Sequence, residues 1–326
     1  MKAAVCRPGG GIAIEDVAKP VPQDDEVLVR VHATTISAAD YRLRTLPYLL
    51  GRMFGHWNPK KPTIFGMEFA GTVESLGKAV TRFRVGDEVF GANLRGLGAH
   101  AEYVCVRASA LETKPANMTL EESAAVVFGA YTALSFLRRA KIQAGQNVLV
   151  YGASGSVGVF AVQLAKHFGA RVTGVCSTAN LGLVRSLGAD AVVDYTTEDF
   201  SQAGPVYDMV FDTVGKSGFT RSLKALKRGR PYVRVSMSGG LGSLPMDILK
   251  QLWISLTGAA KCIGGVSQNK PEDLAFIKGL IEAGALKTVI DRRYPLHEIA
   301  AAYRYAEAGH KKGHVVIVVG PSPLTS

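Results

Sequence analysis

The chain has 326 residues, of which 47% are hydrophobic and 20% charged, and its formal net charge is +11. This composition excludes a disordered chain, and the length exceeds what one hydrophobic core usually supports, so we expect two domains. The sequence has no apolar run long enough for a membrane span, and its first residues lack the apolar stretch of a signal peptide. We therefore expect a cytoplasmic protein.

The cysteines and the basic residues limit the classes of function further. The four cysteines are scattered without a Cys-x-x-Cys pair, which argues against a structural zinc site and fits a reducing compartment. Basic residues are spread along the chain in short clusters, and no nucleic-acid module accompanies them. We expect a solvated basic surface that favours anionic cofactors, with no nucleic acid as a partner.

The first part of the chain has the pattern of short strands. Strand-like runs at 27–33, 68–73 and 87–91 are separated by Gly and Pro, which is typical of a small antiparallel β domain. The period changes at Thr119, where Thr119 and Glu122 have the spacing of a capping box. The Ala-rich run that follows predicts a helix reaching Arg139.

Strands and helices then alternate. Strands are predicted at 147–151, 170–176, 191–194, 209–212 and 232–236, with helices at 156–168 and 180–187. This alternation predicts an α/β fold with a Rossmann doubly wound parallel sheet. The remaining predicted elements are helices at 271–283 and 297–308 and a strand at 314–319.

A Gly-rich turn stands between the first of these strands and its helix. Such a turn lets the backbone approach a pyrophosphate, and the free N–H groups of the helix favour its charge. The alternative is a helix-capping turn packed on the sheet. The predicted cofactor contacts here are Gly152, Ser154, Gly155, Ser156, Val157 and Gly158.

The end of the second strand bears on the choice of cofactor. An NAD site usually has Asp or Glu there, whereas residues 176–180 contain no acid. Ser177 and Asn180 can donate hydrogen bonds to a 2′-phosphate. We therefore predict NADPH as the cofactor, with NADH less favoured.

The motifs together carry a resemblance that extends from about residue 25 to residue 319. They are Gly152–Gly158, Leu187–Asp190, Val193–Tyr195, Gly66–Val73 and Val85–Gly91. In this order they resemble the medium-chain dehydrogenase/reductase superfamily, and within it the zinc-free quinone oxidoreductases of the zeta-crystallin type. The resemblance implies a GroES-like β domain at 1–123 and 267–326, a Rossmann domain at 124–266, and an active site in the cleft between them. It also implies a homodimer joined by edge strands near Lys261–Val266.

The resemblance assigns catalytic candidates as well. The family pattern Asn-Pro-x-Asp followed by Tyr corresponds here to Ser37, Asp40 and Tyr48, with Ser37 in place of the Asn. The resemblance implies that Tyr48 donates a proton to the substrate or orients it. The alternative is that its aromatic ring only packs against neighbouring residues. For Asp40, the alternative to a catalytic base is a structural role as a hydrogen-bond acceptor. Zinc-dependent relatives have a Cys beside the first motif and a His where this chain has Met67, so no metal is expected.

Further cofactor contacts come from the resemblance and from strand ends at the carboxyl edge of the sheet, where ligands bind in such folds. They are Thr132, Tyr195, Val214, Ser236, Met237 and Lys312. The aromatic and basic segment 46–62 is interpreted as a lid or as a weak membrane-surface contact.

The predicted function is NADPH-dependent reduction of a small quinone or α,β-unsaturated ketone by hydride transfer without zinc. Two alternatives stay open at this point: an enoyl-thioester reductase, and a non-enzymatic NADPH-binding or RNA-binding protein.

Overall fold

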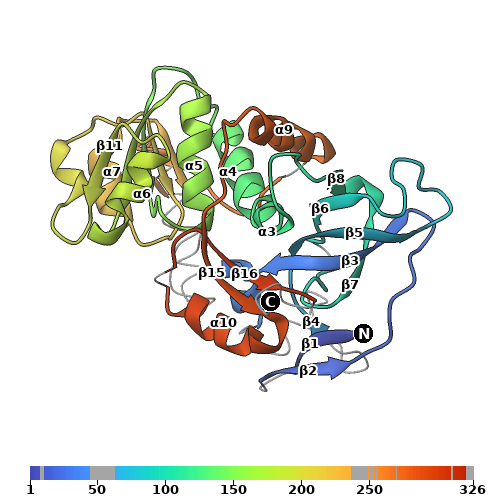
Figure 1. The fold of residues 1–326 in the computed structure, drawn as a ribbon. Helices are drawn as coiled ribbons and strands as arrows, with labels where there is room; N and C mark the ends of the chain where they lie inside the picture. Colours follow the sequence, from blue (N-terminus) through green and yellow to red (C-terminus); the bar gives the residue numbers. More distant parts are fainter. Residues whose placement is uncertain are drawn as a thin grey trace. The chain divides into compact units, whose positions relative to one another are not determined.

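The computed structural model describes residues 1–7, 11–44, 63–94, 96–235, 249, 253–254, 256–268, 270–309 and 311–320. The chain divides into two compact units (Figure 1). Unit 1 comprises Met1–Phe128, Pro271–Glu282 and Thr288–Ser326, and unit 2 comprises Gly129–Lys270 and Ala283–Lys287.

Unit 2 is built on a six-stranded sheet in the order β11-β10-β9-β12-β13-β14, in which every neighbouring pair is parallel. This is the doubly wound order 3-2-1-4-5-6, so the predicted fold class is confirmed. The strands are β9 (Asn147–Tyr151), β10 (Arg171–Cys176), β11 (Ala191–Asp194), β12 (Met209–Asp212), β13 (Pro231–Arg234) and β14 (Lys261–Ile263).

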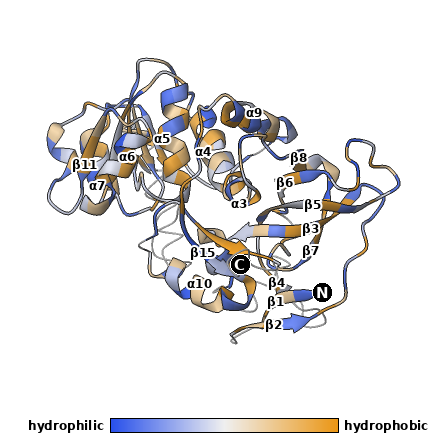
Figure 2. Cartoon of the chain, viewed as in Figure 1, coloured by the Kyte–Doolittle hydropathy of each residue, from blue (hydrophilic) through white to orange (hydrophobic). Residues whose placement is uncertain are grey.

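Helices precede and connect these strands. They are α4 (Val127–Arg139), α5 (Ser156–His167), α6 (Leu181–Ser186) and α7 (Phe219–Ala225), with short 3-10 turns η2 (Thr178–Asn180) and η3 (Phe200–Ala203). Helix α5 is buried from Ser156 to Ala165, and Figure 2 shows it as hydrophobic along most of its length. Strands β9 and β12 are also buried, as expected for parallel strands covered on both faces.

Unit 1 contains a seven-stranded sheet in the order β15-β16-β3-β5-β6-β8, with β7 paired to β3, and a three-stranded sheet β2-β1-β4. All pairs except β15–β16 are antiparallel. The larger sheet consists of β3 (Glu26–Thr35), β5 (Glu68–Leu76), β6 (Glu88–Ala92), β7 (Tyr103–Arg107), β8 (Leu111–Thr113), β15 (Ile290–Pro295) and β16 (His314–Val318).

The smaller sheet of unit 1 has the strands β1 (Lys2–Cys6), β2 (Ile12–Asp16) and β4 (Thr63–Ile64). The helices are α1 (Ala38–Arg44), α3 (Leu120–Ala124), α9 (Pro271–Glu282) and α10 (Ile299–Glu307), with 3-10 turns η1 (Ala108–Ala110) and η5 (Leu296–Glu298). Alternating residues of β3 and β16, among them Val29, Val31, Val315 and Ile317, form the core with α10.

The single helix predicted from Thr119 to Arg139 is wrong. The capping box is present, since Glu122 N–H donates to Thr119 Oγ1 at 3.2 Å and the Glu122 carboxylate accepts from Thr119 N–H. The helix that it starts ends at Ala124, however, and α4 begins at Val127. Ala125 and Val126, at the break, are fully buried and as apolar as the helical residues around them. The hydrophobicity of this Ala-rich sequence therefore does not reveal where one helix ends and the next begins.

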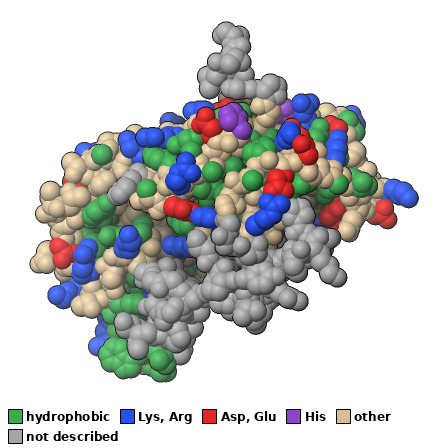
Figure 3. Space-filling model, turned by 90° about the horizontal axis from the view of Figure 1, so that it is seen from below, with side chains coloured by type: hydrophobic (Ala, Val, Ile, Leu, Met, Phe, Trp, Pro, Cys, Tyr) green, Lys and Arg blue, Asp and Glu red, His purple; other side chains and the backbone are tan. Residues whose placement is uncertain are grey.

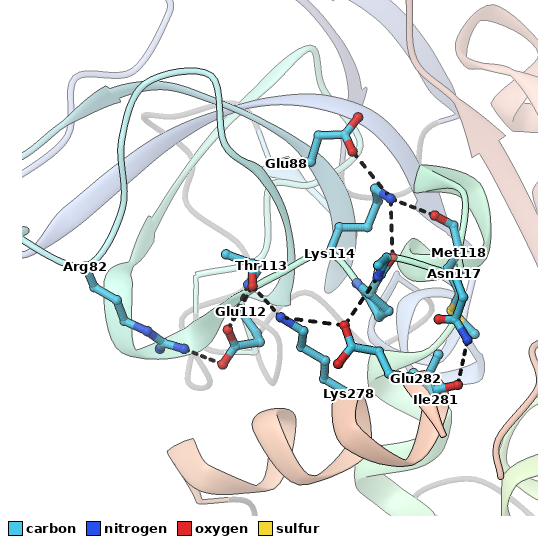
Figure 4. Close-up of polar contacts among 12 residues, drawn as sticks. Arg82, Glu88, Glu112, Thr113, Lys114, Asn117, Met118, Lys278, Ile281 and Glu282 are labelled. Atoms are coloured by element: carbon cyan, nitrogen blue, oxygen red, sulfur yellow. Dashed lines mark hydrogen bonds and ion pairs between the residues drawn. The ribbon is translucent and has the colours of Figure 1, made fainter. Parts of the chain in front are cut away.

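Helix α9 belongs to unit 1 although almost half of the chain separates it from β8 in the sequence. Lys278 Nζ donates to Thr113 Oγ1, and Asn117 Nδ2 donates to the carbonyl oxygen of Ile281 at 2.8 Å (Figure 4). Sequence analysis places the divisions at 123/124 and 266/267. In the structure unit 1 continues to Phe128, because that residue packs beside Cys6, Phe65 and Met67.

The surface accords with a dispersed positive charge. On the face shown in Figure 3, the described Lys and Arg side chains are scattered among hydrophobic and other residues. Within the described ranges, no helix has the length and apolar character needed to cross a membrane.

Candidate functional site

The turn between β9 and α5 is closed by two glycines that the fold itself requires. Gly152 has φ +79°, and a Cβ atom there would lie 2.3 Å from Val214 Cγ2 and 2.6 Å from Thr213 Oγ1. A Cβ atom on Gly158 would lie 2.1 Å from the carbonyl oxygen of Gly152. The turn and the helix therefore meet backbone to backbone at Gly158, while the side chains of Thr213 and Val214 fill the space beside Gly152.

Gly155, the residue before α5, has no such packing reason to be a glycine. Its φ is −80°, which any residue adopts, and a Cβ atom there would meet only the carbonyl oxygen of Gly152, at 3.5 Å. The N–H groups of Ser156, Val157 and Gly158 lie in the first helical turn, where an intrahelical acceptor is lacking. Open space above free N–H groups is what a pyrophosphate needs, so this turn fits a dinucleotide.

A buried carboxylate holds the neighbouring loop against this turn. Asp212, at the end of β12, is fully buried and accepts hydrogen bonds from the N–H groups of Val214 (2.9 Å), Gly215 (2.7 Å) and Ser217 (3.1 Å). Val214 is thereby placed beside Gly152. Sequence analysis did not find Asp212, although an acid that ends an apolar strand just before Val-Gly is a usable signal.

The end of β10 brings three predicted residues together. Asn180 Nδ2 donates to Ser154 Oγ at 3.2 Å and to Ser177 Oγ at 3.1 Å. Asn180 is buried and the two serines are half-buried. This cluster joins the phosphate turn to the segment that follows the second strand, where such folds read the 2′ position of the adenosine ribose.

The acid at the end of β11 is already engaged within the protein. Asp194 accepts from the Thr178 hydroxyl and from Thr196 N–H at 3.0 Å and its hydroxyl at 2.7 Å. These hydrogen bonds, the one from Thr178 first, lower the pKa of the Asp194 carboxyl. Donors within the protein already satisfy the Asp194 carboxylate, so its position does not indicate a site for a ribose hydroxyl.

The structure places the other predicted cofactor residues less closely together. Tyr195 follows β11, is 49% exposed, and has its ring centre 6.4 Å from that of Tyr151. Thr132 is buried in α4. Lys312 belongs to unit 1, where its backbone N–H donates to Asp291 Oδ2 at 3.1 Å. Tyr48, Ser236 and Met237 lie outside the described residues.

Ser37 and Asp40 form a reciprocal hydrogen-bonded pair in unit 1. Asp40 Oδ2 accepts from Ser37 N–H at 2.8 Å and from the Ser37 hydroxyl at 2.6 Å, and Asp40 N–H donates back to Ser37 Oγ at 3.3 Å. Asp40 Oδ1 accepts from Gly66 N–H at 3.2 Å. The pair therefore caps α1, and the spacing Ser-x-x-Asp was the signal for it. A catalytic role for either residue stays a prediction.

Glu68 is a buried acid of unit 1 that directly follows Met67 in the sequence. One carboxylate oxygen accepts from the Thr35 hydroxyl, and the other accepts from Phe128 N–H at 2.6 Å, in the first turn of α4. Burial raises the pKa of the Glu68 carboxyl to about 7, while the two hydrogen bonds and the charge of Lys311 oppose the rise. In the part of the chain that the structure describes, no three His, Cys, Asp or Glu side chains are grouped for a metal ion.

Lys311, rather than its neighbour Lys312, points into unit 1. Lys311 Nζ donates to the carbonyl oxygen of Gly313 at 2.6 Å, and the residue is half-buried, whereas Lys312 is exposed. Burial lowers the pKa of the Lys311 ammonium to about 8, and the charges of Glu68 and Asp291 act in the opposite direction. Sequence alone could not tell which of two adjacent lysines is turned inward.

Comparison with known proteins settles the family. Residues 23–116 match the alcohol dehydrogenase GroES-like domain family, and residues 187–317 match the zinc-binding dehydrogenase family. A 2-methylene-furan-3-one reductase of Solanum lycopersicum is 33% identical, over 93% of this chain and 74% of its own length. A chloroplastic quinone-oxidoreductase homolog of Spinacia oleracea is 32% identical, over 95% of both chains. The chain belongs to the quinone oxidoreductase branch of the medium-chain dehydrogenase/reductase superfamily.

Solved structures agree with this assignment. The quinone oxidoreductase from Coxiella burnetii superposes with a TM-score of 0.85 at 27% identity, over 98% of both chains. The resemblance drawn from the sequence motifs is therefore confirmed.

Two glycines of the turn allow folding and cofactor binding to be separated in this oxidoreductase. We expect Gly158→Ala to lower the free energy of unfolding by roughly 3 kcal/mol, because its Cβ atom would overlap the carbonyl oxygen of Gly152. We expect Gly155→Ala to leave that free energy within about 0.5 kcal/mol but to weaken NADPH binding roughly tenfold, because its methyl group fills the open space. Chemical denaturation and isothermal titration calorimetry measure the two effects. Unchanged NADPH binding by a folded Gly155→Ala variant would show that the cofactor does not approach this turn.

The buried Glu68 carboxyl gives a pH dependence of stability with a defined sign. Its pKa is about 7 in the folded chain against an ordinary 4.5, so between these values the folded state holds a proton that the unfolded state has lost. Its contribution to the free energy of unfolding therefore falls as the pH rises through this window, by up to roughly 3 kcal/mol. We expect Glu68→Gln, which cannot ionise, to remove this fall.

The measurement is chemical denaturation of both proteins at pH values across this window. The buried His314 has its pKa lowered to about 3, chiefly by burial, so its contribution has the opposite sign. It is common to both proteins and cancels in the difference between them. Parallel pH profiles for the two proteins would contradict the raised pKa of Glu68.

Proposed function

We propose that this oxidoreductase uses NADPH to reduce quinones or α,β-unsaturated ketones without a zinc ion. The observation that carries the proposal is the glycine turn at the start of α5, with Gly155 open to a ligand and free N–H groups beneath it. The substrate class is supported by the names of relatives. Besides the two reductases described above, the NADPH-dependent alkenal/one oxidoreductase of Arabidopsis thaliana is 32% identical, over 97% of this chain and 79% of its own length.

The cofactor, when bound, supplies the hydride, and the substrate takes up a proton to complete the reduction. The residues of the turn, 152–158, bind the pyrophosphate, with Thr132, Tyr195, Val214, Ser236, Met237 and Lys312 as the proposed remaining contacts. The Ser37 hydroxyl donates its proton to Asp40, so it is not a ready donor to a substrate oxygen. Tyr48, a phenol that stays neutral near pH 7, is accordingly the proposed proton donor, with water as the alternative.

The preference for NADPH over NADH rests on the end of β10. Residues 176–180 contain no acid to bind a ribose 2′-hydroxyl, and the Asp194 carboxylate is engaged by Thr178 and Thr196. Burial raises the pKa of the Cys176 thiol at this strand end to about 11, with the charge of Asp194 adding to the rise and that of Arg185 opposing it. Charges of both signs therefore act here, and the proposed preference rests on the missing acid.

The proposal that the reaction needs no zinc rests on the positions that would supply ligands. Met67 stands where zinc-dependent relatives have a His, and both oxygens of the Glu68 carboxylate accept hydrogen bonds from protein donors. The absence of bound zinc is itself a prediction that elemental analysis of the purified protein tests. A stoichiometric zinc ion whose removal abolishes turnover would contradict it.

The test of the activity is the oxidation of NADPH with a quinone, a short enone and an enoyl thioester as acceptors, with NADH in parallel. We expect turnover with the quinone or the enone and a kcat/KM at least roughly tenfold higher with NADPH than with NADH. Turnover with the thioester alone would instead indicate an enoyl-thioester reductase. Binding of NADPH without turnover of any acceptor would favour a binding protein, and no binding would refute the proposal.

We also propose a homodimer formed at the edge of the unit 2 sheet. Strand β14 ends the sheet order and pairs with β13 alone among the described strands. Apolar side chains near it are exposed, with Trp253 at 67%, Leu256 at 85% and Val266 at 84%. A free edge beside exposed apolar residues is a typical surface for pairing with a second copy.

Light scattering coupled to size-exclusion chromatography tests the dimer. We expect a dimer for the native chain and a shift toward monomer for Val266→Lys, because a charge would be buried in the interface. Val21→Lys is the matched control, since Val21 is also 84% exposed but belongs to unit 1. A native chain that is monomeric at all accessible concentrations would contradict the proposal.

The cellular location and the surface contacts stay predictions. We retain the cytoplasm as the proposed location, although relatives from Spinacia oleracea and Mus musculus are named chloroplastic and mitochondrial. The segment 46–62, proposed as a lid or a weak membrane contact, lies outside the described residues. No nucleic acid is proposed as a partner.

A further inference from the structure

The Asn180 side chain links the phosphate turn to the end of β10 and leaves one of its own atoms unpaired. Its Nδ2 donates to Ser154 Oγ at 3.2 Å and to Ser177 Oγ at 3.1 Å. The residue is only 8% exposed, and its Oδ1 is buried without a hydrogen-bond partner among the described residues. The amide therefore meets both serines through its nitrogen.

This orientation of the amide is the less costly of the two that the site allows. The nitrogen carries two hydrogens, and both have an acceptor in the serine oxygens. If the amide were reversed, two N–H donors would be buried without acceptors in place of one oxygen without a donor. Buried unpaired N–H groups are costly and rarer than unpaired carbonyl oxygens, so the serines face the amide nitrogen.

The orientation of the amide fixes the hydrogen-bonding role of the serine hydroxyls. Each hydroxyl has one proton to donate and two lone pairs that can accept. Because Ser154 Oγ and Ser177 Oγ each accept from Asn180, each hydroxyl proton is left to be donated elsewhere. Within the described chain neither proton has an acceptor, and both serines are half-buried, at the strand end where folds of this kind bind the 2′ position of the ribose.

We propose that Asn180 is a positioning residue that makes Ser154 and Ser177 hydrogen-bond donors, and that this polarity favours the 2′-phosphate of NADPH over the 2′-hydroxyl of NADH. The proposal rests on the proposed use of a nicotinamide dinucleotide. A phosphate monoester accepts hydrogen bonds through several oxygens, and such bonds from neutral donors are strengthened by its charge. A ribose hydroxyl gains less from two donors, so NADH binds more weakly but is not excluded.

Changing Asn180 to Asp reverses the polarity without altering the side-chain shape. A carboxylate only accepts, so it takes the two serine protons and leaves their oxygens facing the ligand as acceptors. We expect N180D to weaken NADPH binding by roughly thirtyfold or more and NADH binding by less than about threefold. N180A, which removes the amide without adding charge, should reduce the NADPH-to-NADH affinity ratio by roughly five- to tenfold.

The affinities are measured on the full chain by isothermal titration calorimetry with NADPH and NADH. Adenosine 2′,5′-bisphosphate and adenosine 5′-monophosphate are titrated as fragments that differ only in the 2′ group. N147D is the matched control, because Asn147 makes the same charge change at the opposite end of β9 in the same unit. It should leave the affinity ratio unchanged, which separates the local effect from the loss of net positive charge.

A double-mutant cycle with Ser177 tests whether Asn180 acts through the serine. We expect N180A and S177A to lower the affinity ratio non-additively, because the first change already frees the hydroxyl to rotate. Additive losses, or an unchanged ratio in folded N180D and N180A, would overturn the inference. If the native chain bound neither dinucleotide, the proposed function itself would fail, and the two failures are thus distinguishable.

Discussion

The contact between α5 and the end of β9 is the constraint on which the cofactor half of this chain depends. At Gly158 the helix backbone approaches the carbonyl oxygen of Gly152 so closely that no side chain fits between them. Strand β10 also packs closely against this turn, since a Cβ atom on Gly174 would lie 3.2 Å from Ala153 Cβ. This close packing brings Asn180, four residues beyond the strand, within hydrogen-bond distance of Ser154 in the turn. The close packing of α5 and β10 against this turn thus determines both the shape of the turn and the position of Asn180 beside Ser154.

Buried carboxylates serve mainly as clamps for backbone N–H groups in this molecule. Asp212 holds three such groups beside the phosphate turn, and Asp40 holds two in unit 1. A buried carboxylate is costly unless such donors satisfy it, which explains why each acid sits at a loop with several free N–H groups. Glu68 differs because its two donors only partly offset its burial, and its pKa remains raised to about 7. The protonation state of Glu68 therefore changes near neutral pH.

The sequence predicted those features whose signal is local. Alternation of apolar strands with amphipathic helices located β9 to β13, and the glycine pattern located the phosphate turn, because both depend on residues close together in the chain. The break between α3 and α4 was missed, since Ala125 and Val126 are equally apolar in a helix or in a buried bend. The clamps of Asp212 and Glu68 were missed because their partners are set by strand register and by contacts distant in sequence. The spacing of Ser37 and Asp40 was detectable as a helix cap, but the sequence prediction for them followed the family pattern instead.

Serine residues in a cofactor loop do not by themselves determine the chemistry that the loop presents. The same hydroxyl donates to a phosphate or accepts from a ribose, according to where its proton is directed. In this chain the direction follows from Asn180, which is nearly inaccessible to solvent and contacts both serines through nitrogen. The missing acid after β10 is therefore only part of the basis for the proposed use of NADPH. The proposed selectivity arises one layer behind the residues that face the ligand, where a buried amide sets the polarity of two neutral hydroxyls.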